Sequence, residues 1–117
     1  MTQDPEIIAR KIGHIGRITL NRPKALNALN AATIKELLGL FSTLKDDGSV
    51  KVVILTGAGE KAFVAGADIS EMQPIDAVTG RQFALLGHQL GAAIEDLPQP
   101  VIAAVNGFAL GGGCEVA

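Results

Sequence analysis

The run Val52–Thr56 constrains the fold of this chain more than any other stretch. Four consecutive apolar residues stand there between Lys51 and Gly57. A strand with one wet face alternates apolar and polar residues, whereas an unbroken apolar strand is typical of a sheet covered on both faces. We therefore expect Val52–Thr56 to lie centrally in a sheet and to be buried on both of its faces.

The N-terminal part of the chain predicts further β structure. Ile7–Arg10 and Ile15–Leu20 are short β-prone runs, and Gly13-His14 between them is a turn signal. The tripeptide Asn21-Arg22-Pro23 then breaks the pattern. A hairpin is the simplest interpretation.

Two stretches have the periodicity of amphipathic helices. The first runs from about Asn30 to the polar group at 46–48, and the second ends at Pro98 and Pro100, just before an apolar strand at Val101–Val105. Their periodic apolar residues are Ile34, Leu37, Leu38, Phe41 and Leu44 in the first and Phe83, Leu86, Leu90, Ile94 and Leu97 in the second. At 117 residues without a linker or repeat, the chain has room for one α/β domain or part of one.

Two turns of small residues each lead into a predicted helix start. Ala65-Gly66-Ala67 precedes Asp68, whose spacing to Glu71 matches a capping box. Gly111-Gly112-Gly113 leaves backbone N–H groups open to a ligand, and a helix beginning there adds the positive end of its dipole. Such a turn suits an oxyanion, and Glu115 would place a carboxylate beside the bound substrate.

Each of these polar residues also has a purely structural interpretation. Taken alone, Glu115 is more often a first-turn residue that the helix dipole stabilises. Asp68 is better explained as a helix cap than as a general base. Cys114 is interpreted as a small packing residue, since neither His14 nor His88 sits in a motif that would activate a thiol.

Composition argues against several classes of function. Ten Lys and Arg against twelve Asp and Glu, with 3% aromatic residues, do not favour nucleic-acid binding, which uses basic surfaces and stacking rings. The apolar run Val101–Val105 is far shorter than the roughly 18 residues of a membrane span. A single cysteine and an N-terminus without a signal-peptide pattern predict a cytoplasmic location. Two distant histidines and one cysteine cannot assemble a metal site.

Four stretches, in this order and at this separation, resemble the enoyl-CoA hydratase (crotonase) family. They are Asn21–Leu29, Ala65–Asp68, Pro100–Gly107 and Gly111–Glu115. The resemblance runs from about Ile15 to Ala117 and implies the α/β ClpP/crotonase fold, a spiral of β-β-α units. It also implies that residues 1–117 are the N-terminal part of a single crotonase-like domain whose C-terminal part is absent, and that the complete protein is a homo-trimer or a dimer of trimers.

The resemblance assigns chemistry to three residues. The amides of Ala67 and Gly112 match the family's oxyanion hole, where two N–H donors hold the negative charge that develops on a thioester oxygen. Glu115 matches the first of two catalytic glutamates, the one that activates water. The second belongs to a part of the family pattern that follows Ala117, so the chain alone is expected to be inactive or nearly so.

The resemblance also implies a coenzyme A site and no cofactor, because the CoA thioester is the substrate. Lys24 is expected near a phosphate, and the backbone after the first small-residue turn near the adenine and the thioester end. The predicted contact residues are Lys24, Ala25, Leu26, Ala65, Gly66, Ala67, Asp68, Ile69, Ser70 and Gly112. Ser70 stands where the family often has Lys, which predicts weaker binding of the nucleotide.

Three functions remain open from the sequence. The first is a lyase that adds water to a short- to medium-chain trans-2-enoyl-CoA, as in fatty-acid β-oxidation. The second keeps the fold but catalyses another acyl-CoA reaction of the superfamily, such as isomerisation or decarboxylation. The third is a non-catalytic fragment that binds acyl-CoA or another subunit.

Overall fold

The computed structural model describes residues 5–67 and 77–117, and of residues 79, 112 and 115 the backbone only. A four-stranded sheet has the order β1-β2-β3-β5. Its strands are β1 (Ile7–Ile12), β2 (Ile15–Leu20), β3 (Val52–Gly57) and β5 (Val101–Ala104). β1 and β2 are antiparallel, which confirms the predicted hairpin, and β2, β3 and β5 run parallel.

The central strand β3 lies between β2 and β5, as its apolar run predicts. Val53 and Leu55 are fully buried in the core beneath the helices. Ile54, on the other face, is only half-buried, and its register neighbour Ile102 on β5 is 53% exposed. The expectation of burial on both faces is therefore wrong for the described residues, because the core they build covers one face of the sheet.

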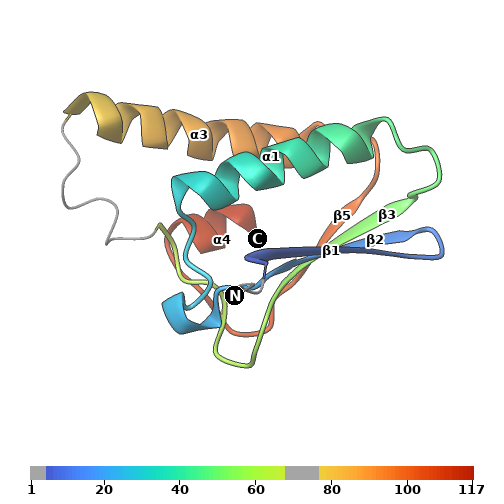
Figure 1. The fold of residues 1–117 in the computed structure, drawn as a ribbon, viewed down its shortest axis with the longest axis horizontal. Coiled ribbons are helices and arrows are strands. Elements are labelled where there is room, and N and C mark those ends of the chain that lie inside the picture. The colour runs from blue at the N-terminus through green and yellow to red at the C-terminus, as the bar shows by residue number, and fades with distance from the viewer. Residues whose placement is uncertain (1–4, 68–76) are drawn as a thin grey trace.

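Both predicted helices are present, as α1 (Ala31–Lys45) and α3 (Ala77–Glu95), and they pack against each other over the sheet (Figure 1). At the start of α1, the Asn30 side chain accepts from the Thr33 N–H (2.8 Å) and the Thr33 hydroxyl accepts from the Asn30 N–H (3.0 Å). This reciprocal pair satisfies two donors that a helix start leaves unpaired. At the other end, Gln99 donates to the Leu44 carbonyl (2.6 Å).

The chain repeats a β-β-α path. β3 is followed by β4 (Ala62–Val64) and α3, and β5 by β6 (Phe108–Ala109) and α4 (Gly112–Val116). β4 and β6 pair in parallel as a second, two-stranded sheet. In the first unit, β2 is followed by Leu29, which forms a single parallel bridge to Ala67, and then by α1. This bridge stands where the other two units have their second strand. This arrangement is the spiral of β-β-α units expected from the sequence.

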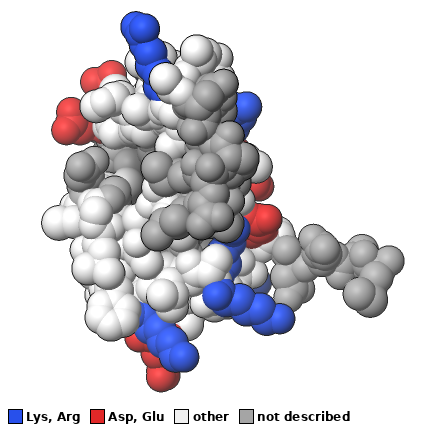
Figure 2. Space-filling model, turned by 90° about the vertical axis from the view of Figure 1, so that its left-hand side faces the viewer, with Lys and Arg blue, Asp and Glu red and all other residues white. Residues whose placement is uncertain are grey.

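Two observations concern the outer surface. Within the described parts of the chain, no helix is both long and apolar enough to cross a bilayer. On the face shown in Figure 2, basic side chains are separated by acidic and uncharged ones, so the described residues there form no continuous basic surface.

Candidate active site

The segment after β4 lies beside the segment that leads into α1. The Leu29 N–H donates to the Gly66 carbonyl (2.8 Å), and the Ala65 N–H donates to the Leu26 carbonyl (3.1 Å). A trans peptide places each carbonyl and the following N–H on opposite sides of the chain, and the described chain has no cis peptide bond. Because the Gly66 carbonyl faces Leu29, the Ala67 N–H points away from Leu29.

The start of α4 lies on that opposite side. The Leu110 N–H donates to the Val64 carbonyl (3.1 Å), which seats the end of β6 against β4. Gly113 packs so closely that a Cβ atom there would lie 1.8 Å from the Val64 carbonyl oxygen. Only glycine permits this approach. The Ala67 N–H therefore points to the side of its segment on which α4 begins.

The first turn of α4 aims a second donor out of the helix. The Gly113 N–H donates to the Leu110 carbonyl (2.8 Å) and the Cys114 N–H to the Gly111 carbonyl (3.1 Å). Because the Gly111 carbonyl points into the helix, the Gly112 N–H on the same peptide points out of its N-terminal end. The structure thus places the two amides that the sequence singled out, those of Ala67 and Gly112, on adjacent segments.

Glu115 follows in the same short helix, three residues after Gly112. The structure gives its backbone position, and the direction of its carboxylate stays a prediction. Cys114 is exposed, so it does not pack as predicted against the described residues. The reason is that α4 faces the protein through Gly113, which is buried, and Val116, which is half-buried, while Cys114 lies on another side of the helix.

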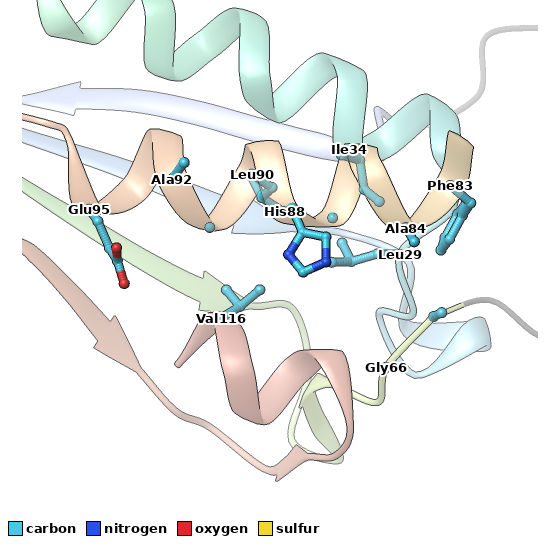
Figure 3. Close-up of a pocket in the computed structure, with 13 residues that line it drawn as sticks. Leu29, Ile34, Gly66, Phe83, Ala84, His88, Leu90, Ala92, Glu95 and Val116 are labelled. Carbon is cyan, nitrogen blue, oxygen red and sulfur yellow. The ribbon is translucent and has the colours of Figure 1, made fainter. Parts of the chain in front are cut away.

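A cavity of about 590 Å³ opens beside the Ala67 segment. Its walls come from α3, the start of α1, Gly66-Ala67 and Val116 of α4, and they are largely apolar (Figure 3). His88 lines it from α3 and is exposed. The volume lies within the range of small-molecule sites, about 300–1,000 Å³.

The predicted coenzyme A residues near the N-terminus lie in a short 3₁₀ helix, η1 (Pro23–Ala25), and the turn after it. Lys24 is exposed, Ala25 is half-buried, and Leu26 is 39% exposed with φ 53°. Lys24 and Leu26 line a second cavity of about 470 Å³ together with Lys61, which the sequence analysis missed. The predicted residues Asp68, Ile69 and Ser70 lie outside the described part of the chain.

Two asparagines organise the loop between β3 and β4, a role that the sequence analysis also missed. Asn27 is 1% exposed and donates to the carbonyls of Ala58 (3.1 Å) and Ala62 (2.8 Å). Asn106 donates to the carbonyls of Gly59 (2.9 Å) and Ala62 (3.0 Å). A signal was present for Asn27, because asparagine tolerates the left-handed backbone (φ 55°) that this turn requires.

The repeated β-β-α path, the two sheets and the paired turns define the class: a crotonase-like α/β fold. Residues 10–117 match the family model described as Enoyl-CoA hydratase/isomerase, and the chain belongs to this family. A solved enoyl-CoA hydratase from Bacillus anthracis superposes with a TM-score of 0.94 at 41% identity, over 96% of this chain and 44% of that one. The predicted family and fold class are confirmed.

Curated relatives carry more specific names. The chain is 56% identical over 111 residues to a short-chain-enoyl-CoA hydratase of Clostridium acetobutylicum, covering 95% of this chain and 42% of the relative. It is 50% identical over 111 residues to a crotonyl-CoA hydratase of Syntrophomonas wolfei, covering 95% of this chain and 43% of the relative. The chain thus spans about two fifths of the length of these relatives.

Proposed function

We propose that the complete protein is an enoyl-CoA hydratase that adds water to the double bond of a trans-2-enoyl-CoA. The observation that carries the proposal is the orientation of two backbone amides. The Ala67 N–H points to the side on which α4 begins, and the Gly112 N–H points out of the N-terminal end of α4. The names of the short-chain-enoyl-CoA and crotonyl-CoA hydratases similar to this chain support the same reaction.

The proposed mechanism uses these amides as an oxyanion hole. Attack of water on C3 of the enoyl group moves negative charge onto the thioester oxygen, and two fixed N–H donors stabilise that charge. Glu115 accepts a proton from the attacking water. The α-carbon must then receive a proton, and we assign this step to a second glutamate of the family pattern, protonated before the reaction and outside these 117 residues. The activity is therefore proposed for the complete protein, and the chain alone is expected to be inactive.

Coenzyme A is proposed to lie along the η1 turn and the Ala65–Ser70 segment. The hydrogen bond from the Ala65 N–H to the Leu26 carbonyl joins the η1 turn to residues 65–67, the described part of this segment, which supports a single binding surface. Lys24 is exposed and can pair with a phosphate group. The thioester end then reaches Ala67.

Three further proposals rest on the family resemblance. The complete protein is a homo-trimer or a dimer of trimers, it works in the cytoplasm, and it uses neither a metal nor a cofactor beyond its CoA substrate. Light scattering of the complete protein tests the assembly.

Product analysis with crotonyl-CoA tests the reaction. Formation of 3-hydroxybutyryl-CoA is the expected result, and its absence would contradict the hydratase proposal. Isomerisation is the second candidate, because the matching family model includes isomerases. Conversion of a 3-enoyl-CoA to a 2-enoyl-CoA without hydration would favour it. Binding of acetoacetyl-CoA without any turnover would instead indicate a non-catalytic protein.

A further inference from the structure

We propose that Gly87 and Gly91 of α3 set the longest acyl chain that the site accepts. The proposal rests on the proposed function and deepens it, because it concerns the acyl part of the same substrate. The two glycines lie four residues apart in α3 and therefore on one face of the helix. Both line the cavity of about 590 Å³.

Neither glycine is required by close packing. A Cβ atom built on Gly87 or on Gly91 would meet nothing within 4 Å. The contrast is Gly113, where a Cβ atom would collide with the backbone of β4. Gly87 is exposed and Gly91 is half-buried. Because both also line the cavity, a side chain at either position would occupy open space at its wall and narrow it.

The position of the cavity fits an acyl chain. Gly66 and Ala67 belong to its wall, so the cavity begins at the proposed thioester site. Figure 3 shows Gly66 below the end of α3 that carries Phe83 and Ala84, with Glu95 at the far end of the helix. In sequence, Gly87 and Gly91 lie between these two ends of α3. They therefore line the part of the cavity into which a longer acyl chain would extend.

Glycine is also a poor choice for the helix itself. It is the weakest helix former after proline, and α3 carries both residues well inside its bounds. Larger residues at these positions would favour the helix, so the open space is the property that glycine supplies here. For the same reason, a substitution to leucine is not expected to disrupt α3.

The test compares Gly87→Leu and Gly91→Leu in the complete protein with the parent. The matched control is Gly39→Leu, because Gly39 is exposed on α1, also has nothing within 4 Å of its Cβ position, and lines neither cavity described above. The kcat/KM values for crotonyl-, hexenoyl-, octenoyl- and decenoyl-CoA are measured for each protein. Calorimetry with butyryl-CoA and octanoyl-CoA gives the corresponding Kd values without turnover.

We expect the octenoyl-to-crotonyl ratio of kcat/KM to fall about tenfold or more in the α3 variants, the scale on which pocket shape discriminates acyl groups. The Gly39→Leu profile should stay as in the parent, and any loss with crotonyl-CoA in the α3 variants should be smaller than their loss with octenoyl-CoA. An unchanged chain-length profile, or an equal loss at every length in a folded variant, would overturn the proposal. If circular dichroism shows a leucine variant to be unfolded, Gly91→Ala and Gly87→Ala take its place.

The kinetic measurement and the calorimetric measurement distinguish a failure of this proposal from a failure of the proposed function. A parent that hydrates none of the four substrates contradicts the hydratase proposal. The ratio of the butyryl-CoA and octanoyl-CoA dissociation constants still shows whether the α3 variants exclude the longer chain. An unchanged ratio overturns the acyl-length proposal whichever reaction the protein catalyses.

Discussion

Replacing Gly113 by alanine tests how the proposed oxyanion hole is held together. The added Cβ atom would lie 1.8 Å from the Val64 carbonyl oxygen, whereas real Cβ contacts essentially never fall below 3.0 Å. The start of α4 must therefore move away from β4 by about 1 Å along this contact. A misplacement of about 1 Å can lower a rate about 10²-fold, and loss of one oxyanion donor costs roughly 10²–10³-fold. We expect kcat to fall by about 10²-fold in the complete protein.

The clash also has a cost in stability. Overpacking costs typically about 1–3 kcal/mol, which exceeds the roughly 0.5–1 kcal/mol that alanine gains over glycine within a helix. Thermal unfolding followed by circular dichroism measures this loss of stability separately from the change in kcat. Gly39→Ala is the control, since its Cβ atom meets nothing within 4 Å. A folded Gly113→Ala protein with the parent's kcat for crotonyl-CoA would refute the reasoning.

Two further predictions concern the described scaffold. Asn27→Ala removes two donors and the acceptor of the Arg22 N–H (2.8 Å), so it should lower the free energy of unfolding by about 2–4 kcal/mol in chemical denaturation, and a loss below about 1 kcal/mol would contradict this role. The Ser49 hydroxyl and backbone N–H, both donating to the Asp47 carboxylate, lower the pKa of that carboxyl. Its contribution to stability is therefore present above its ordinary pKa and is lost as the pH falls through the lowered value. Ser49→Ala should raise the Asp47 pKa toward its ordinary value in an NMR titration, and an unchanged pKa would contradict the assignment.

The elements of the fold could be predicted because each leaves a pattern within its own short stretch of sequence. Of the periodic apolar residues of α1, Ile34, Leu37 and Phe41 are buried, and Leu38 and Leu44 are half-buried against the same core. The hairpin of β1 and β2 follows from its turn signal, and the centrality of β3 follows from its apolar run. The segments that cover each face of the four-stranded sheet could not be predicted in this way. Hydrophobicity indicates that Ile54 and Ile102 favour burial, but it carries no information on which segment covers them.

The sequence indicated which residues would form the candidate site, but it did not indicate their geometry. The glycine turn and the Ala65–Ala67 turn were identified from sequence. The direction of the Ala67 amide depends on the hydrogen bond from Leu29 to Gly66, and the seating of α4 beside it depends on the bond from Leu110 to Val64; both join segments far apart in the chain. Local patterns do not encode such pairings. The partners of Asn27 and Asn106 were missed for the same reason, since both side chains bind a loop far away in the sequence, although the turn at Asn27 itself left a local signal.

Hydration of crotonyl-CoA by the complete protein and its Glu115→Gln variant is the most direct test of the proposed chemistry. Glutamine keeps the size of the side chain and cannot accept the proton from water. We predict that kcat falls by about 10²–10⁴-fold, the usual contribution of a general base, while the Kd for butyryl-CoA stays unchanged. Equal kcat values in the parent and the variant would contradict the assignment of Glu115 as the base.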